Sequence, residues 1–250
     1  MNIILSGANG KMGNVLARLI AEKDNMQVVA GLDIAESTDG AFPIHNCAAN
    51  FTEDADVIID FSNPAALPQV IALAESRNLP IVVATTGLSE QQMADVRALS
   101  AKVPVFFSAN MSLGINLLSE LVKKAASILG DEFDIEIVEK HHNQKVDAPS
   151  GTALLLANSA KEGLSFEPEY VYERHSVRKK REKKEIGISA VRAGTIVGEH
   201  DVIFGGRDEV ITLSHLAISK EIFANGAINA AAFLIGKAPG MYSMKDMLEA

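Results

Sequence analysis

The sequence is poor in residue types that mark several classes of protein. It holds a single cysteine, Cys47, among 250 residues, which excludes an internal disulfide and a metal site built on several thiolates. No apolar stretch reaches the roughly 18 residues that span a bilayer, and the first residues lack the basic and apolar regions of a secretion signal. We therefore expect a cytoplasmic protein without a membrane partner.

Positive charge is also scarce. Lys and Arg number 23 against 32 Asp and Glu, so the formal net charge is −9. Because such a surface repels a phosphate backbone, we expect no nucleic-acid partner, and any small anionic ligand has to be held by local positive groups. The 48% of hydrophobic residues and the chain length are those of a globular protein with one large domain or two modest ones.

The N-terminus carries a nucleotide-binding pattern. A short apolar run, residues 3–5, leads into the glycines of GANGKMG at residues 7–13. Such glycines let the backbone approach a pyrophosphate that binds at the start of the next helix. A second apolar run, residues 26–32, ends in Asp33, whose position suits hydrogen bonds to the adenine-side ribose. The glycine spacing is one residue longer than the standard fingerprint, but the combination predicts a Rossmann-type domain.

Alternating strands and helices continue to residue 107. We expect strands at 57–61, 81–84 and 103–107, a helix opened by Asn63 and Pro64, and another opened by a capping box of Ser89 and Gln92. Ligands bind at the carboxyl ends of parallel strands, so the polar turns there are expected to line the nicotinamide side of the cofactor site. These turns are Phe61–Ser62–Asn63, Thr85–Thr86–Gly87 and Ser108–Ala109–Asn110–Met111.

After a helix at 114–129 the pattern changes. Apolar and acidic residues alternate over 133–137, and further strands are expected at 186–191, 195–204 and 210–217. Strands grouped in this way indicate a largely antiparallel sheet in a smaller α+β domain. An alanine-rich helix at 220–235 is expected to return to the first domain. We thus predict a dinucleotide-binding domain from 1–112 and 220–250 and a substrate-binding and oligomerisation domain from 113–219.

The most reactive stretch reads EKHHNQKVDAPSGTA, residues 139–153. If it is extended, His141 and Lys145 lie on one side and His142 on the other. An imidazole exchanges protons near neutral pH, and a lysine ammonium can hold a carboxylate. The residues that end this stretch resemble a helix N-terminus, which can bind a second anionic group.

Other polar residues are assigned structural or surface roles. The basic run at residues 177–185 is expected to be a solvated loop. His200 is expected to be a surface or structural residue, and His215 a hydrogen-bonded core or interface residue. Nothing near Cys47 would activate its thiol.

Nearly the whole chain resembles the 4-hydroxy-tetrahydrodipicolinate reductases, once called dihydrodipicolinate reductases, of lysine biosynthesis. The resemblance rests on GANGKMG, on ATTG from residue 84, SANMSLGIN from 108, EKHHNQKVDAPSGTA from 139, VRAGTIVGEH from 191 and FANGAINAA from 223. It implies NAD(P)H-dependent reduction of 4-hydroxy-tetrahydrodipicolinate to tetrahydrodipicolinate with loss of water, in the diaminopimelate route to lysine. It also implies a small dicarboxylate substrate, a mixed second sheet and a homotetramer.

The resemblance also implies roles for individual residues. His141 is the implied proton donor or acceptor, and Lys145 is implied to work with it in catalysis as the substrate-side acid. His142, Gly151 and Thr152 are implied to bind substrate. The implied cofactor residues are Gly7, Ala8, Asn9, Gly10, Lys11, Met12, Asp33, Ala84, Thr85, Thr86, Ser108, Ala109, Asn110 and Met111.

The cofactor is expected to be NADH, with NADPH possible. Relatives that accept the phosphorylated form often carry Arg or Lys directly after the acid on the second strand, whereas Asp33 is followed by Ile34, Ala35 and Glu36. A negative Asp33 repels a 2′-phosphate, although Lys11 could offset that repulsion.

Two alternatives remain from the residues. A semialdehyde dehydrogenase of similar build needs a thiolate at the head of the second domain, and Cys47 lies in the first. A non-enzymatic NAD(P) sensor would keep the glycine loop without needing His141 or Lys145.

Overall fold

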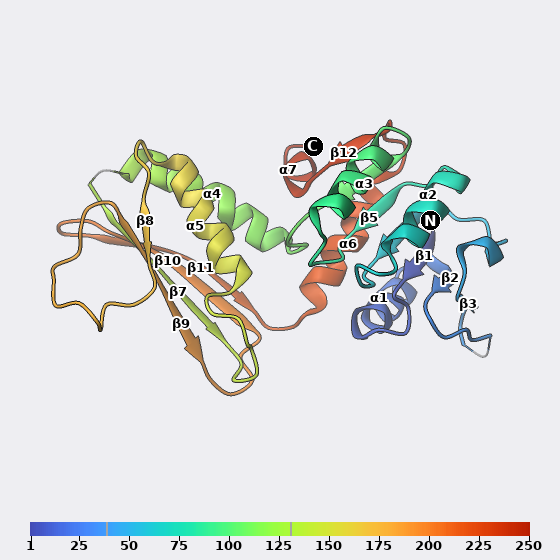
Figure 1. Cartoon of the computed structure of the whole chain (residues 1–250), viewed down its shortest axis with the longest axis horizontal. Coiled ribbons are helices and arrows are strands. Elements are labelled where there is room, and N and C mark those ends of the chain that lie inside the picture. Colours follow the sequence, from blue (N-terminus) through green and yellow to red (C-terminus); the bar gives the residue numbers. More distant parts are fainter. Residues whose placement is uncertain (39, 131) are drawn as a thin grey trace. The chain divides into compact units, whose positions relative to one another are not determined.

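The structure is a computed structural model that describes residues 1–38, 40–130 and 132–250. The chain divides into two compact units, drawn in Figure 1. The first comprises Met1–Ser112 and Glu221–Ala250, and the second Leu113–Lys220. The expected division differs from this one only at Lys220, which belongs to the second unit.

The first unit is built on a seven-stranded sheet whose named strands pair in parallel. The order is β12-β6-β5-β4-β1-β2-β3, which contains the Rossmann order 3-2-1-4-5-6. The strands are β1 (Asn2–Ser6), β2 (Gln27–Leu32), β3 (Ile44–His45), β4 (Val57–Asp60), β5 (Ile81–Val83), β6 (Pro104–Phe107) and β12 (Gly240–Tyr242). Their side chains are buried along most of β1, β4 and β5, as expected for strands covered on both faces.

Helices cover both faces of this sheet. One core includes residues of α1 and α6, and a second core includes residues of α2 and α3. The helices are α1 (Lys11–Ala21), α2 (Leu67–Arg77), α3 (Glu90–Ser100), α6 (Glu221–Leu234) and α7 (Met244–Leu248), with a 3-10 turn η1 (Ala48–Asn50). The predicted Rossmann-type fold is therefore confirmed.

Two predicted helix starts had different outcomes. The capping box before α3 is confirmed, because the Ser89 hydroxyl accepts from the Gln92 backbone and the Gln92 side chain accepts from the Ser89 backbone. The prediction of a helix start at Asn63 and Pro64 is wrong. Asn63 instead caps a turn, accepting from Ala65 N–H, and α2 begins at Leu67.

The second unit has a five-stranded sheet of order β11-β10-β7-β9-β8. Its elements are α4 (Leu113–Leu129), β7 (Asp134–His141), α5 (Gly151–Gly163), β8 (Glu169–Val171), β9 (Glu185–Arg192), β10 (Gly198–Gly205) and β11 (Val210–Ala217). Helices α4 and α5 lie side by side against the sheet in Figure 1, and their apolar residues share one core with it.

The expectation of a largely antiparallel sheet is wrong. Strand β10 pairs antiparallel with β7 and β11, but β9 pairs parallel with both β7 and β8. A parallel neighbour needs a long crossover, which α5 and the chain after it supply between β7 and β9. The short strand β8 within that crossover was not predicted. The sheet is mixed, as the family resemblance implies.

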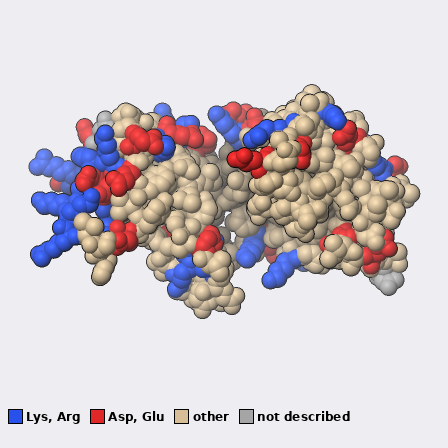
Figure 2. Space-filling model, viewed as in Figure 1, with Lys and Arg blue, Asp and Glu red and all other residues tan. Residues whose placement is uncertain are grey.

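The basic run at residues 177–185 is mostly exposed, as predicted, and Figure 2 shows Lys and Arg side chains gathered at one end of this unit. Arg181 departs from the prediction. Its guanidinium is largely covered and donates to Asp134 at 2.7 Å and to Glu136 at 3.1 Å. One member of the run therefore ties the loop to β7.

Within the described ranges, none of the helices combines the length and apolarity needed to cross a bilayer.

Candidate active site

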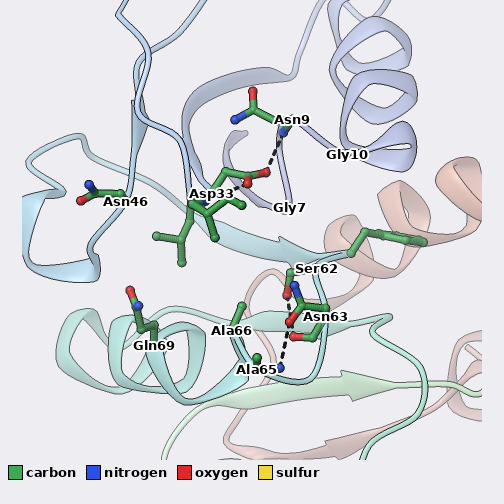
Figure 3. Close-up of a pocket in the computed structure, with 13 residues that line it drawn as sticks. Gly7, Asn9, Gly10, Asp33, Asn46, Ser62, Asn63, Ala65, Ala66 and Gln69 are labelled. Carbon is green, nitrogen blue, oxygen red and sulfur yellow. Dashed lines mark hydrogen bonds between the residues drawn. The ribbon is translucent and has the colours of Figure 1, made fainter.

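A cavity of about 500 Å³ opens in the first unit, at the ends of β1, β2 and β4. Figure 3 shows the glycine loop and Asp33 on one side of it and the start of α2 on the other. The cavity is lined by Gly7, Asn9, Gly10, Leu32, Asp33, Ile34, Asn46, Phe61, Ser62, Asn63, Ala65, Ala66 and Gln69. This is the edge of the sheet where the doubly wound topology places a ligand.

Two glycines give the loop its shape. Gly7 has φ +80°, and a Cβ there would lie 2.7 Å from the Phe61 carbonyl oxygen. A Cβ on Gly13 would lie 2.3 Å from the Gly7 carbonyl oxygen, so α1 packs directly on the loop. A side chain at either position would push these segments apart, which explains the need for glycine.

Asp33 joins the loop to the end of β2. Its Oδ2 accepts from Asn9 N–H at 2.9 Å and its Oδ1 from Ile34 N–H at 2.7 Å. The Asn9 amide in turn donates to the Ala35 carbonyl at 3.1 Å. The carboxylate therefore keeps a defined position at the cavity wall, where it can also accept from ligand hydroxyls.

The residues present fit a dinucleotide. The loop leaves room for its backbone to approach a pyrophosphate, the start of α1 offers N–H groups, and the Asp33 carboxylate stands beside the loop. Among the described residues that line the cavity there is no Lys or Arg.

Asp60 was missed by sequence reasoning. It is fully buried and accepts from the hydroxyls of Ser62 at 2.6 Å and Thr85 at 2.7 Å. The carboxylate thereby fixes the turn after β4 to the turn after β5. Its signal in the sequence is an acid that ends an otherwise apolar run, residues 57–60.

Only some of the predicted cofactor residues line the cavity. Gly7, Asn9, Gly10 and Asp33 line the cavity, whereas Ala8 is buried behind the loop and Lys11 and Met12 begin α1 outside the lining. The turns at 84–86 and 108–111 follow β5 and β6 at the same edge of the sheet, beyond this cavity. Lining residues absent from the prediction are Leu32, Ile34, Asn46, Ala65, Ala66 and Gln69.

The second unit holds a polar cluster centred on Glu139. The alternation that buries Ile135 and Ile137 also turns Glu139 inward, and its side chain is completely buried. Arg192 binds it with two nitrogens, each at 2.7 Å. His141 Nδ1 lies at 2.5 Å and Ser150 N–H donates at 3.0 Å.

This pairing keeps the carboxylate charged. Burial acts to raise the pKa of Glu139, but hydrogen bonds from Arg192 and His141 outweigh it and hold that pKa below its usual value. The bond to Glu139 correspondingly raises the pKa of Arg192. The four hydrogen-bond donors around it offset the cost of burying this carboxylate.

His200 lies against His141. The ring centroids are 5.2 Å apart in an edge-to-face arrangement, and His200 Nε2 lies 3.0 Å from the Ser150 hydroxyl. Burial, with a smaller electrostatic contribution from the neighbouring His141, lowers the pKa of His200 to about 4, so the His200 ring is neutral at physiological pH.

His200 was expected to be a surface or structural residue, and the structure places it inside the cluster. The signal was the alternation of β10, where Gly198, His200, Val202 and Phe204 all point inward. For His215 the expected hydrogen bond is not found at Nδ1, which is buried and has no partner among the described residues.

The predicted helix start is confirmed. Ser150 is the N-cap of α5, its hydroxyl accepting from Ala153 N–H at 3.1 Å, and the helix begins at Gly151. A Cβ at Gly151 would meet no atom within 4 Å, so the first turn has open space for a ligand group. Thr152 follows in the same turn.

The assumption of an extended segment through Lys145 is wrong. Strand β7 ends at His141, and Lys145 N–H donates to the His142 carbonyl in a turn. Lys145 Nζ pairs with Asp147 at 2.9 Å, and its side chain is 21% exposed. The loop, rather than strand alternation, therefore positions Lys145.

A Rossmann-type sheet with a glycine loop, together with an imidazole paired to a buried carboxylate near a helix start, is typical of nucleotide-dependent oxidoreductases. Family models divide the chain in the same way: residues 1–111 match the dihydrodipicolinate reductase N-terminus and residues 114–248 the C-terminus. The chain belongs to the dihydrodipicolinate reductase family. Reductases of this family use a nicotinamide dinucleotide.

Full-length relatives agree. A 4-hydroxy-tetrahydrodipicolinate reductase of Caldanaerobacter subterraneus subsp. tengcongensis is 52% identical over 249 residues, which cover 100% of this chain and 98% of the relative. One of Clostridium novyi is 45% identical over 247 residues, covering 99% and 98%. Among solved structures, a dipicolinate-bound dihydrodipicolinate reductase of Paenisporosarcina sp. TG-14 has the same fold, with a TM-score of 0.81, 23% identity and 97% of each chain covered.

These findings set the two alternatives aside. Both halves match a reductase family, and the enzyme class is that of its relatives rather than of a sensor. A semialdehyde dehydrogenase is also disfavoured by chemistry, because Cys47 lies in the first unit and is exposed.

Proposed function

We propose that the protein reduces 4-hydroxy-tetrahydrodipicolinate to tetrahydrodipicolinate, with loss of water, in the diaminopimelate route to lysine. The observation that carries this proposal is the full-length match to reductases of that name, at 52% and 45% identity. The predicted proton donor His141 is also linked through Glu139 to the predicted anion site at the start of α5.

In this proposal the first unit binds the dinucleotide. The glycine loop and the start of α1 hold the pyrophosphate, and Asp33 accepts from the ribose hydroxyls. The turns at 84–86 and 108–111 contact the nicotinamide half. When bound, the reduced nicotinamide supplies a hydride.

The second unit binds the substrate, whose two carboxylates need two positive sites. The first turn of α5, at Gly151 and Thr152, takes one through backbone N–H groups and the helix dipole. Lys145 takes the other as a mobile ammonium, which requires it to exchange Asp147 for the ligand. His142, half-buried at the end of β7, is a further substrate contact.

His141 delivers the proton that the reduced ring needs at the carbon next to the one that accepts hydride. Its Nδ1 bond to Glu139 supports this role, because the ring is oriented and the other nitrogen is left to exchange the proton.

NADH is the preferred cofactor in this proposal, with NADPH as a weaker substitute. Asp33 and the lack of Lys or Arg among the described lining residues both disfavour a 2′-phosphate. Lys11, at the start of α1, follows the lining residue Gly10 directly and is the basic residue proposed to offset this repulsion.

The active form is proposed to be a cytoplasmic homotetramer joined through the sheet of the second unit. The apolar side chains exposed on and just after its edge strand β11, Val210, Leu216 and Ile218, support this proposal. Light scattering on the purified protein tests it, and a monomer at working concentration contradicts it.

Oxidation of NADH with freshly generated substrate tests the activity. Lys145→Ala should lose most turnover and still bind NADH, because the lysine acts on substrate only. Lys161→Ala is the matched control, since Lys161 is another lysine of the second unit held by one carboxylate, Glu167. No rate above background with the unmodified enzyme contradicts the activity, and full turnover in Lys145→Ala contradicts the role of Lys145.

A further inference from the structure

We infer that Glu139, with Arg192 as its counter-ion, is the positioning residue of the reaction: it sets the tautomer of His141 and ties that imidazole to the substrate end of α5. The inference rests on the proposed function, in which His141 delivers the proton.

Each oxygen of Glu139 receives two donors. Oε2 accepts from His141 Nδ1 at 2.5 Å and from Arg192 Nη1 at 2.7 Å. Oε1 accepts from Arg192 Nη2 at 2.7 Å and from Ser150 N–H at 3.0 Å. An ionised carboxylate has no proton to give, so the hydrogen between it and His141 belongs to Nδ1. Nε2 is then the nitrogen that gains and loses the proton.

The rest of the ring is equally constrained. A Cβ on Gly198 would lie 3.1 Å from His141 Nε2, so β10 passes close to this nitrogen and a side chain at Gly198 would crowd it. The His200 ring packs edge to face against it. His141 is thus held by Glu139 from its own strand and bounded by β10, with only 12% of its side chain exposed.

The charged groups around His141 come from three segments. Glu139 lies on β7 and Arg192 on β9, while Lys145 and Asp147 form an ion pair in the loop before α5. Arg192 also donates to the Asp147 carbonyl at 2.7 Å. His200 on β10 adds no charge, because its burial keeps it neutral. The field at His141 is therefore set chiefly by the Glu139–Arg192 pair and Lys145–Asp147.

The Ser150 bond extends the effect to the anion site. Ser150 is the N-cap of α5, whose first turn is proposed to hold a substrate carboxylate. One carboxylate thus bonds both to the proton donor and to the residue that starts the helix. Moving or neutralising it changes the spacing between the two sites, a displacement that is costly for catalysis even when small.

Two substitutions with opposite expected effects test the inference. Glu139→Gln removes the negative charge beside His141, so the pH at which kcat/KM falls on the alkaline side should decrease by about one unit, with kcat reduced about tenfold or more. Arg192→Met leaves Glu139 without its counter-ion, so the alkaline fall in kcat/KM should move to higher pH. Glu136→Gln is the matched control: Glu136 lies on β7 and pairs with Arg174 and Arg181, and it should leave the profile in place.

Nitrogen-detected NMR of labelled histidine gives a readout that does not depend on turnover. The free enzyme should show His141 protonated at Nδ1 in a strong hydrogen bond, and this signal should be lost in Glu139→Gln and kept in Glu136→Gln. If Glu139→Gln does not fold, two measurements still test the positioning role: the shift of the alkaline fall in kcat/KM to higher pH in Arg192→Met, and the proton on His141 Nδ1 in the unmodified enzyme.

The outcomes separate the inference from the function. The positioning role is overturned if Glu139→Gln and Arg192→Met both lose activity without any shift in the pH at which kcat/KM falls. It is also overturned if neutral His141 carries its proton at Nε2 in the unmodified enzyme. Absence of reductase activity in an enzyme with the Nδ1 proton in place instead overturns the proposed function.

Discussion

In the proposed function Asp33 determines the choice between NADH and NADPH, and Asp33→Ser tests this role directly. The carboxylate is half-buried at the cavity wall and is held by the N–H groups of Asn9 and Ile34. Serine keeps a small hydrogen-bonding group for the ribose and removes the charge. The backbone of the loop should change little, since Gly7 and Gly13 set its shape.

The size of the effect follows from the repulsion between Asp33 and a 2′-phosphate. Two unit charges about 4 Å apart repel by about 1 kcal/mol in water and about 4 kcal/mol near a protein surface. The cavity is open to solvent on one side, so an intermediate value of about 2 kcal/mol is appropriate, which corresponds to about 30-fold in relative efficiency.

The assay is kcat/KM for each cofactor at saturating substrate. The unmodified enzyme should favour NADH, and Asp33→Ser should shift the NADH to NADPH ratio about 30-fold toward NADPH. Glu36→Ser is the control, because it makes the same change in net charge at an exposed residue outside the cavity lining. An unchanged ratio in Asp33→Ser, or an equal shift in Glu36→Ser, would refute the reasoning, as would an unmodified enzyme that prefers NADPH.

Three further predictions concern the second unit. Burial lowers the pKa of His200 from 6.5 to about 4, so between these pH values the unfolded chain binds a proton at His200 that the folded chain does not, and about 3 kcal/mol of stability is lost as pH falls. The melting temperature should therefore decrease less from pH 7 to pH 4 in His200→Gln than in the unmodified protein, and equal decreases would contradict the buried neutral ring. Ser150→Ala removes the hydroxyl that caps α5 and that bonds to His200, so the free energy of unfolding in a urea titration should decrease by about 2 kcal/mol. A decrease of less than about 0.5 kcal/mol would contradict a stabilising role for these two hydrogen bonds. Gly198→Ala places a methyl group 3.1 Å from His141 Nε2 and should reduce kcat about tenfold. Gly205→Ala on the same strand should leave kcat unchanged, because the nearest atom to its methyl group would be 4.0 Å away, and similar rates in both variants would show that the His141 ring can move.

Much of the local structure was determined by the sequence alone. The glycine loop, the capping box before α3 and the start of α5 were all predicted, because each depends on groups within a few residues of one another. The same holds for the alternation in β7 that buries Ile135 and Ile137. The wrong predictions at α2 and at Lys145 are also local: in both places a turn intervenes where a regular element was expected.

The polar contacts of the candidate site were decided by the tertiary structure. Glu139 and Arg192 are 53 residues apart in the sequence, Ser150 and His200 are 50 apart, and Asp60 and Thr85 are 25 apart. Alternation could have shown that Glu139 and His200 point inward, but not which groups they meet. Their partners depend on strand order, and the parallel pairing of β7 with β9 is what brings Arg192 to Glu139. A buried charge has to find its counter-charge wherever the fold places one, and that information lies in the packing rather than in any short stretch of residues.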